Sequence, residues 1–147
     1  MTTATQTTGT TVAGEYDEGT GTILTETYLV DGVPHREDGP ASITYDAASN
    51  RRVLVWMLAG VITRPGRKPA YVFMRENGTT IRACWYVGGV LHRKGAAAII
   101  DYDSAGRAIA TRSQWYSKGR RYCPLCRQTL EVWASGDECQ PTEEASA

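Results

Sequence analysis

The chain has 147 residues with 16 basic and 16 acidic side chains, a length that suits one domain. It has no apolar stretch long enough to span a bilayer and no basic start followed by an apolar segment, so we expect a cytoplasmic protein whose four cysteines are reduced or bind metal. Residues 51–127 contain 15 of the 16 Lys/Arg and only three acids, whereas residues 1–50 and 128–147 are acidic. This segregation of charge has two interpretations: a basic fold with solvated acidic flanks, or a basic surface for an anionic partner.

The N-terminal residues 1–22 are rich in Thr and Gly, and we expect them to be flexible. A degenerate repeat of about 29 residues follows over residues 23–122. Its glycines are spaced 28, 29 and 30 residues apart, and an aromatic residue stands four positions before each. The glycines are Gly32, Gly60, Gly89 and Gly119, and the aromatic residues are Tyr28, Trp56, Trp85 and Trp115.

Each unit alternates apolar and polar residues, as half-buried strands do. In the second half of the units, residues 41, 43 and 45, then 70, 72 and 74, then 98, 100 and 102 would share one sheet face. In the first half, residues 54–58, 81–87 and 109–115 alternate around the Trp. Tight turns are expected at Asp31-Gly32 and Gly88-Gly89, and return turns at Asn77-Gly78 and 104–106.

This pattern predicts a mostly β protein, a stack of about four antiparallel β-hairpin repeats that forms a twisted sheet. Two strands cannot bury their apolar face alone, so successive hairpins should pair edge to edge into roughly six to eight strands. The face that remains open can be covered by curling of the sheet, by a partner, or by a second copy in a homodimer.

The phrase W-Y-x-x-G-x-x-H-R-x-x-G-P-A resembles the MORN-like hairpin repeats of phage, giant-virus and bacterial proteins. The resemblance covers roughly residues 23–122 and is carried by Trp85-Tyr86, Gly89, His92-Arg93, His35-Arg36 and Gly39-Pro40-Ala41. The second unit has Thr63 in place of His. The resemblance implies a stack of hairpins with a binding or scaffolding role toward lipid headgroups or protein partners, and it implies no particular reaction.

His35 and His92 recur at a spacing of 57 residues, each followed by Arg. A catalytic interpretation would make them acid–base groups, but no carboxylate recurs beside them. We interpret each imidazole as a structural group that holds the turn to the next hairpin. No nucleophile elbow, phosphate-binding glycine loop or paired catalytic carboxylates occur, so we predict a protein without enzymatic activity.

The tail over residues 123–139 contains Cys123-x-x-Cys126 and then Cys139, the shape of a zinc knuckle with three ligands. Cys84 or His92 would have to supply the fourth ligand. Zinc binding and reduced structural thiols both remain open. Residues 140–147 should form a flexible acidic end.

Basic and aromatic residues also alternate on the strand face opposite the Trp. Such a surface suits an anionic partner, because its basic side chains attract the partner's negative groups while its aromatic rings stack or pack against the partner. Ordinary solvent-facing strand residues are the alternative. The candidate partner-binding residues are Arg82, Tyr86, Arg112, Tyr116, Lys118, Arg120, Arg121, and the aromatic pair Tyr71 and Phe73.

We therefore expect a non-catalytic inhibitor or adaptor that docks a host protein or a ribonucleoprotein through this face. A phage origin, which would place it in a host cytoplasm, follows from the resemblance alone. The alternative is direct nucleic-acid binding aided by the zinc-knuckle tail. An enzyme centred on His35 and His92 is the third hypothesis.

Overall fold

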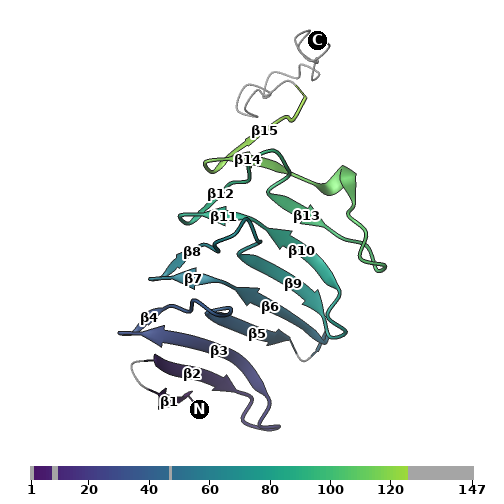
Figure 1. The fold of residues 1–147 in the computed structure, drawn as a ribbon. Helices are drawn as coiled ribbons and strands as arrows, with labels where there is room; N and C mark the ends of the chain where they lie inside the picture. The colour runs from purple at the N-terminus through teal and green to yellow at the C-terminus, as the bar shows by residue number, and fades with distance from the viewer. Residues whose placement is uncertain (1, 8–9, 47, 126–147) are drawn as a thin grey trace.

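The computed structural model describes residues 2–7, 10–46 and 48–125, which are almost entirely β-strand and turn. The long strands form one antiparallel sheet in the order β1-β2-β3-β5-β6-β9-β10-β13 (Figure 1). These strands are β1 (Thr2–Thr7), β2 (Thr10–Tyr16), β3 (Ile23–Val30), β5 (Ser42–Asp46), β6 (Arg51–Val55), β9 (Tyr71–Arg75), β10 (Thr80–Cys84) and β13 (Ile99–Asp101).

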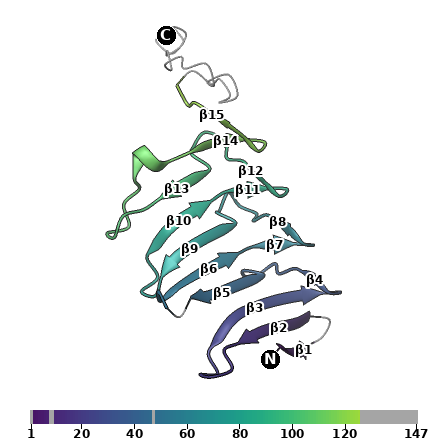
Figure 2. The same ribbon diagram turned by 180° about the vertical axis from the view of Figure 1, so that it is seen from behind.

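Short hairpins form a second column along one side of this sheet, one for each repeat (Figures 1 and 2). The first is the end of β3 paired with β4, and the other three are separate two-stranded ladders. Their strands are β4 (Val33–Pro34), β7 (Met57–Leu58), β8 (Val61–Ile62), β11 (Tyr86–Val87), β12 (Val90–Leu91), β14 (Trp115–Ser117) and β15 (Arg120–Tyr122).

All four short hairpins turn through two residues of positive φ, the geometry that matches strand twist. The first and third use Asp31-Gly32 and Gly88-Gly89, as predicted. The second and fourth use Ala59 (φ 47°) and Lys118 (φ 49°) before their glycines, a conformation that costs a residue with a Cβ. Ladder hydrogen bonds offset this cost: the Gly60 N–H, for example, donates to the carbonyl of Pro34 in the preceding hairpin at 2.8 Å.

The strand register confirms the prediction that the apolar residues of successive repeats share one face of the sheet. Ile43 lies opposite Leu54, and Leu54 opposite Val72. Ala83 then joins Val72 to Ile100 across β9, β10 and β13. Alternation along the strands thus places the apolar positions of successive repeats on the same side of the sheet.

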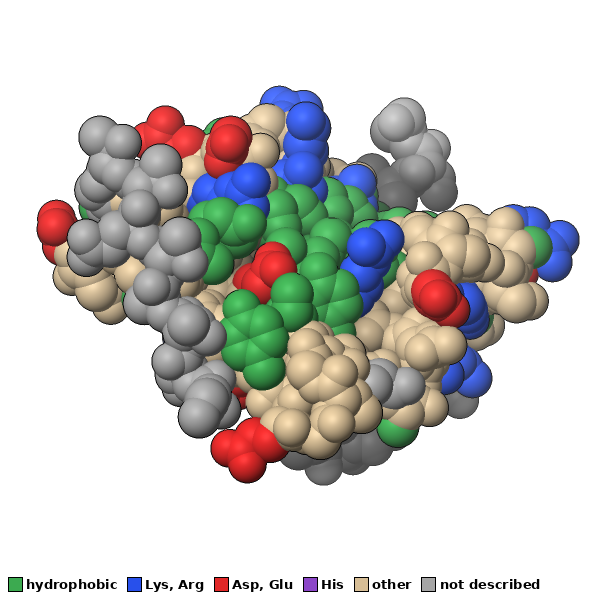
Figure 3. Space-filling model, turned by 90° about the horizontal axis from the view of Figure 1, so that it is seen from below, with side chains coloured by type: hydrophobic (Ala, Val, Ile, Leu, Met, Phe, Trp, Pro, Cys, Tyr) green, Lys and Arg blue, Asp and Glu red, His purple; other side chains and the backbone are tan. Residues whose placement is uncertain are grey.

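The sheet is a single layer, so its core is thin. The most deeply buried residues are small ones at the junction of the two columns, namely Ala41, Ala70 and Ala98, each fully buried, together with Trp85 at 7% exposure. No large side chain in the described residues is buried completely. Hydrophobic side chains accordingly gather in a central area bordered by charges when the stack is viewed from its N-terminal end (Figure 3).

Three predictions about the elements need correction. Residues 2–7 and 10–16 are not irregular: they form β1 and β2, and Ala13 lies opposite Thr27 of β3, which extends the sheet beyond the repeats. The strands around Trp56 and Trp85 are not continuous, because each Trp stands between the long strand and the short hairpin, whereas Trp115 begins β14.

The third correction concerns the fourth repeat. The expected strand over residues 109–115 contains a 3-10 helix at Ala110–Arg112. Its partner β13 has only three residues, and pairing resumes where Gln114 exchanges hydrogen bonds with Ile99. Residues 110–112 therefore have no strand to pair with and bulge out of the sheet. In the described part of the chain, no helix has the length and hydropathy that a membrane crossing requires.

Candidate partner-binding surfaces

An arginine lies over the aromatic ring in each of the first three repeats. The guanidinium carbon of Arg64 is 3.7 Å from the centroid of Trp56, and that of Arg93 is 3.7 Å from Trp85. Arg36 lies 3.9 Å above Tyr28 in the first repeat. A cation over the face of an aromatic ring is attracted by the ring quadrupole, so these arginines cap the junction between hairpin and sheet.

The caps are held by further contacts. Arg64 and Arg93 each donate from Nη1 to a carbonyl in the following loop, that of Pro69 at 3.2 Å and that of Ala97 at 3.0 Å. Arg36 instead donates to Asp38 at 2.8 Å. Gly39 is buried beside it, and a Cβ there would lie 2.7 Å from the Arg36 guanidinium carbon, so a larger residue would require the Arg36 side chain to move.

The two histidines link neighbouring hairpins as predicted. The backbone N–H of Ala59 donates to Nδ1 of His35 at 2.9 Å, and that of Lys118 donates to Nδ1 of His92 at 3.1 Å. In both cases the donor belongs to the tight turn of the next repeat. The imidazole therefore accepts a hydrogen bond that orients the hairpin column.

The fourth repeat has no arginine cap. Cys123 stands where the earlier repeats carry Arg, and no guanidinium lies over Trp115 among the residues that the structure describes. Tyr122 contacts Trp115 edge-on, with ring centroids 6.1 Å apart at 72°. Within the described part of the chain, the Trp115 ring thus lacks the guanidinium that lies over each of its counterparts.

The predicted aromatic residues converge on one side of the sheet. Tyr71 lies opposite Cys84 across the β9–β10 ladder, and Phe73 lies opposite Arg82. Burial raises the pKa of the Tyr86 hydroxyl, and the nearby Cys84, Tyr71 and Tyr116 raise it further, so these three tyrosines from successive repeats are neighbours. We call this surface the tyrosine face and define it by Tyr71, Phe73, Arg82, Tyr86, Tyr116 and Arg121.

Arg82 is already engaged within the chain. It donates to both carboxylate oxygens of Asp101, from Nε at 2.6 Å and from Nη2 at 3.0 Å. These hydrogen bonds hold the pKa of the Asp101 carboxyl below its usual range, and the charge of the nearby Arg112 lowers it further. Of the basic residues predicted for this face, Arg112 and Arg121 are exposed and form no ion pair with a described acid.

The last hairpin divides the remaining predicted cations between two surfaces. Tyr116 lies opposite Arg121, so both face the same side, that of the tyrosine face. Trp115 lies opposite Tyr122, and alternation places Arg120 with them on the other side. Lys118 is in the turn between, where it is exposed. The sequence alone did not separate these groups.

Two pockets that share His92, Arg93 and Lys94 lie along the hairpin column, and the smaller one also reaches Tyr86 of the tyrosine face. The larger, of about 670 Å³, is lined by Trp115 and Tyr122 together with Lys94 and Arg120, and we call it the Trp115 groove. The second, of about 530 Å³, lies between the loops of the second and third repeats and also reaches Lys94. No acidic side chain of the described residues lines either pocket.

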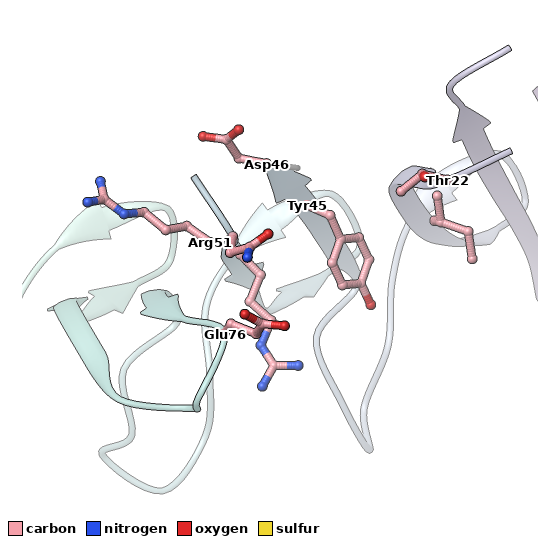
Figure 4. Close-up of a pocket in the computed structure, with 8 residues that line it drawn as sticks. Thr22, Tyr45, Asp46, Arg51 and Glu76 are labelled. Carbon is pink, nitrogen blue, oxygen red and sulfur yellow. The ribbon is translucent and has the colours of Figure 1, made fainter. Parts of the chain in front are cut away.

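A third pocket, of about 330 Å³, lies at the opposite edge of the sheet, beside the return turns. Its lining has both signs of charge, with Asp46 and Glu76 as well as Arg51 and Arg52. Asp46 points away from Tyr45 and Glu76 (Figure 4). With mixed charges this pocket has no preference for an anion, unlike the pockets near Trp115.

The cysteines provide limited support for a metal site. Cys84 is 6% exposed, and burial raises the pKa of its thiol to about 11, so it is a neutral core residue. Cys123 follows β15 and is half-buried. Cys126 and Cys139 lie outside the described residues, and within those residues no three His, Cys, Asp or Glu side chains are grouped as metal ligands. Zinc binding stays a prediction.

No family model, curated protein or solved structure matches this chain. The MORN-like resemblance therefore remains a prediction, carried by the repeated residues themselves. The Trp115 groove was not predicted from the sequence, although one signal was present: the fourth repeat has Cys123 where its predecessors have Arg.

Proposed function

We propose that this chain is a non-catalytic binding protein that docks an acidic protein partner through the tyrosine face. The observation that carries the proposal is the row of Tyr71, Tyr86 and Tyr116, contributed by successive repeats to one side of the sheet. Tyr and Arg are enriched at protein interfaces, because they supply large contact areas with polar ends.

The charges of this face favour an acidic partner. Arg51 and Arg75 lie opposite each other on the same side as Phe73, and Arg51 approaches the Phe73 ring at 5.7 Å. Exposed Arg112 and Arg121 add positive charge at the other end. Asp101 is neutralised by Arg82, so cations outnumber free carboxylates along the row.

In the described part of the chain, no second layer of the protein covers this face. Phe73 and Tyr71 are half-buried, and Val53 and Val55 lie beside them on β6. A partner that covers these side chains would bury apolar area and satisfy the arginines together, which is how a compact interface gains its affinity. An origin in a phage and an inhibitory role remain predictions.

The test is affinity capture from an extract of the cells that produce the protein, followed by a binding measurement with the purified partner. The tyrosine-face variant carries Tyr86→Ala, Tyr116→Ala and Arg121→Ala. The matched control carries Tyr45→Ala, Tyr102→Ala and Arg52→Ala on the opposite face. Both variants are first shown to be folded by circular dichroism.

We expect the control to keep the partner of the unmodified protein and the tyrosine-face variant to bind at least tenfold more weakly, the effect of losing hot-spot residues. Equal binding by the tyrosine-face variant, or equal loss by the control, would contradict the proposal. The extract is treated with nuclease before capture, so that a partner held only through nucleic acid is removed and does not enter the comparison.

A further inference from the structure

The Trp115 groove combines an open aromatic ring with positive charge. In the second and third repeats a planar guanidinium lies 3.7 Å above the Trp ring and closes it. In the fourth repeat Cys123 takes the place of that Arg, and the Trp115 ring lines the groove instead. Among the residues that the structure describes, the place over this indole that a guanidinium fills in the earlier repeats is left as a slot.

The cations around this slot are available. Lys94 and Arg120 are exposed and line the groove, and neither forms an ion pair with any acid in residues 2–7, 10–46 and 48–125. Arg93 also lines the groove. One of its N–H groups donates to the carbonyl of Ala97, and the other N–H groups of the guanidinium can donate to a ligand. His92 adds its imidazole to the same wall.

These features together determine the shape and the charge of a ligand that fits the groove. A group that occupies the slot has to be planar to stack on Trp115, as the guanidinium does in the other repeats. A cationic group is disfavoured by Arg93, Lys94 and Arg120. A carboxylate would satisfy these cations but is repelled by the negative face of the ring. A planar ring joined to a separate anionic group meets both conditions.

We propose that the Trp115 groove binds a nucleotide unit, with its base stacked on Trp115 and its phosphate held by Lys94 and Arg120. Base stacking on aromatic side chains beside a cationic groove is how single-stranded nucleic acids are held without sequence preference. A volume of about 670 Å³ is within the range of small-ligand sites. The nucleotide can be free or part of a single strand, and the chemistry of recognition is the same.

This site does not depend on the docking function proposed above. It lies on the side of the last hairpin opposite Tyr116 and Arg121, and it shares no residue with the tyrosine face. The variants that test one surface leave the other intact, so each proposal fails or stands separately.

The experiment titrates the full-length protein with three probes at low salt: adenosine 5′-monophosphate, a fluorescein-labelled ten-nucleotide oligothymidylate, and a ten-residue polyglutamate. We expect one or both nucleotide probes to bind and polyglutamate to bind at least tenfold more weakly. Binding of the mononucleotide identifies a free-nucleotide site, and binding of the oligonucleotide alone identifies a strand. Equal binding of polyglutamate, or no binding by either nucleotide probe, would overturn the proposal.

Four variants locate the ligand. Trp115→Ala should weaken binding roughly 5- to 150-fold, the loss expected for one stacked base. The double variant Lys94→Ala, Arg120→Ala should also weaken binding and flatten its salt dependence. Arg107→Ala is the charge control, because Arg107 is ion-paired to Asp103 at the opposite edge, and it should leave binding unchanged.

The decisive variant is Cys123→Arg, which restores the residue that caps the ring in the other repeats. It adds a positive charge, so attraction of phosphate by charge alone predicts tighter binding. Our proposal predicts the reverse, a loss as large as that of Trp115→Ala, because the guanidinium fills the slot. Tighter binding by Cys123→Arg, or unchanged binding by Trp115→Ala, would show that no base stacks there. A thermal melt verifies that each variant is folded.

Discussion

The first three repeats and the fourth differ in how they use the same aromatic position. Tyr28, Trp56 and Trp85 are each covered by an arginine of their own repeat, whereas Trp115 lines a groove. One substitution in the repeat, Cys123 for Arg, accompanies the change from a closed junction to an open one. In a repeat protein the positions that depart from the common pattern are therefore the ones to examine for binding, because the shared positions are needed to stack the units.

The largest expected effect compares the two tryptophans directly. Trp85 is 7% exposed and donates from its indole N–H to the carbonyl of Arg67 at 2.9 Å, so Trp85→Ala should lower the free energy of unfolding by about 3–5 kcal/mol. Trp115→Ala should cost roughly 1–2 kcal/mol, since its ring is half-buried. Urea denaturation followed by circular dichroism measures both. Equal losses would mean that the two rings contribute alike to the fold.

A smaller effect is expected from removing a cap. Arg93→Ala loses the contact with Trp85 and the hydrogen bond to Ala97, together about 1–2 kcal/mol of unfolding free energy. Arg93→Lys should not restore this, because an ammonium cannot lie flat on the ring while it donates to the carbonyl. Arg120→Ala, an exposed residue on the uncapped repeat, is the control and should change stability by less than about 0.5 kcal/mol. Full rescue by Lys would show that charge alone matters.

The smallest expected effect is a pH dependence of the unfolding free energy, which distinguishes the Arg82–Asp101 ion pair from the arginine caps. Arg82 holds the folded-state pKa of Asp101 below its unfolded value, so the stabilisation is fully present above the unfolded value and is lost as pH falls through the folded one. Because Arg82 is about half exposed, solvent screens the pair, and Asp101→Asn should cost about 1 kcal/mol at neutral pH.

This difference between the unmodified protein and Asp101→Asn should shrink as pH is lowered from 7 toward 3 in urea denaturation. The cost of Arg93→Ala should stay constant over the same range, because its cap on Trp85 contains no carboxylate. A pH-independent cost for Asp101→Asn would argue that Asp101 acts through packing and not through its charge.

Parts of the candidate surfaces could be predicted from local sequence. Alternation placed Tyr71 and Phe73 together, and the repeat indicated that His35 and His92 hold the next turn, as the hydrogen bonds to Ala59 and Lys118 confirm. The pairing of Arg82 with Asp101 could not be predicted, because it joins residues 19 positions apart through a register that only the assembled sheet defines. The strands β1 and β2 were missed for a related reason: their Thr-rich composition signals a loop, and only the edge of β3 makes them strands.

By itself the sequence determined the period, the glycines of the turns and the face that each strand residue occupies, because these depend on spacing along a few neighbouring residues. Tertiary structure alone decided which side of the last hairpin each cation faces, since this hairpin is a separate ladder and not a continuation of the long sheet. It also decided that Arg93 covers Trp85 while Trp115 remains open, because a guanidinium can stack only where the loop that carries it returns over the ring.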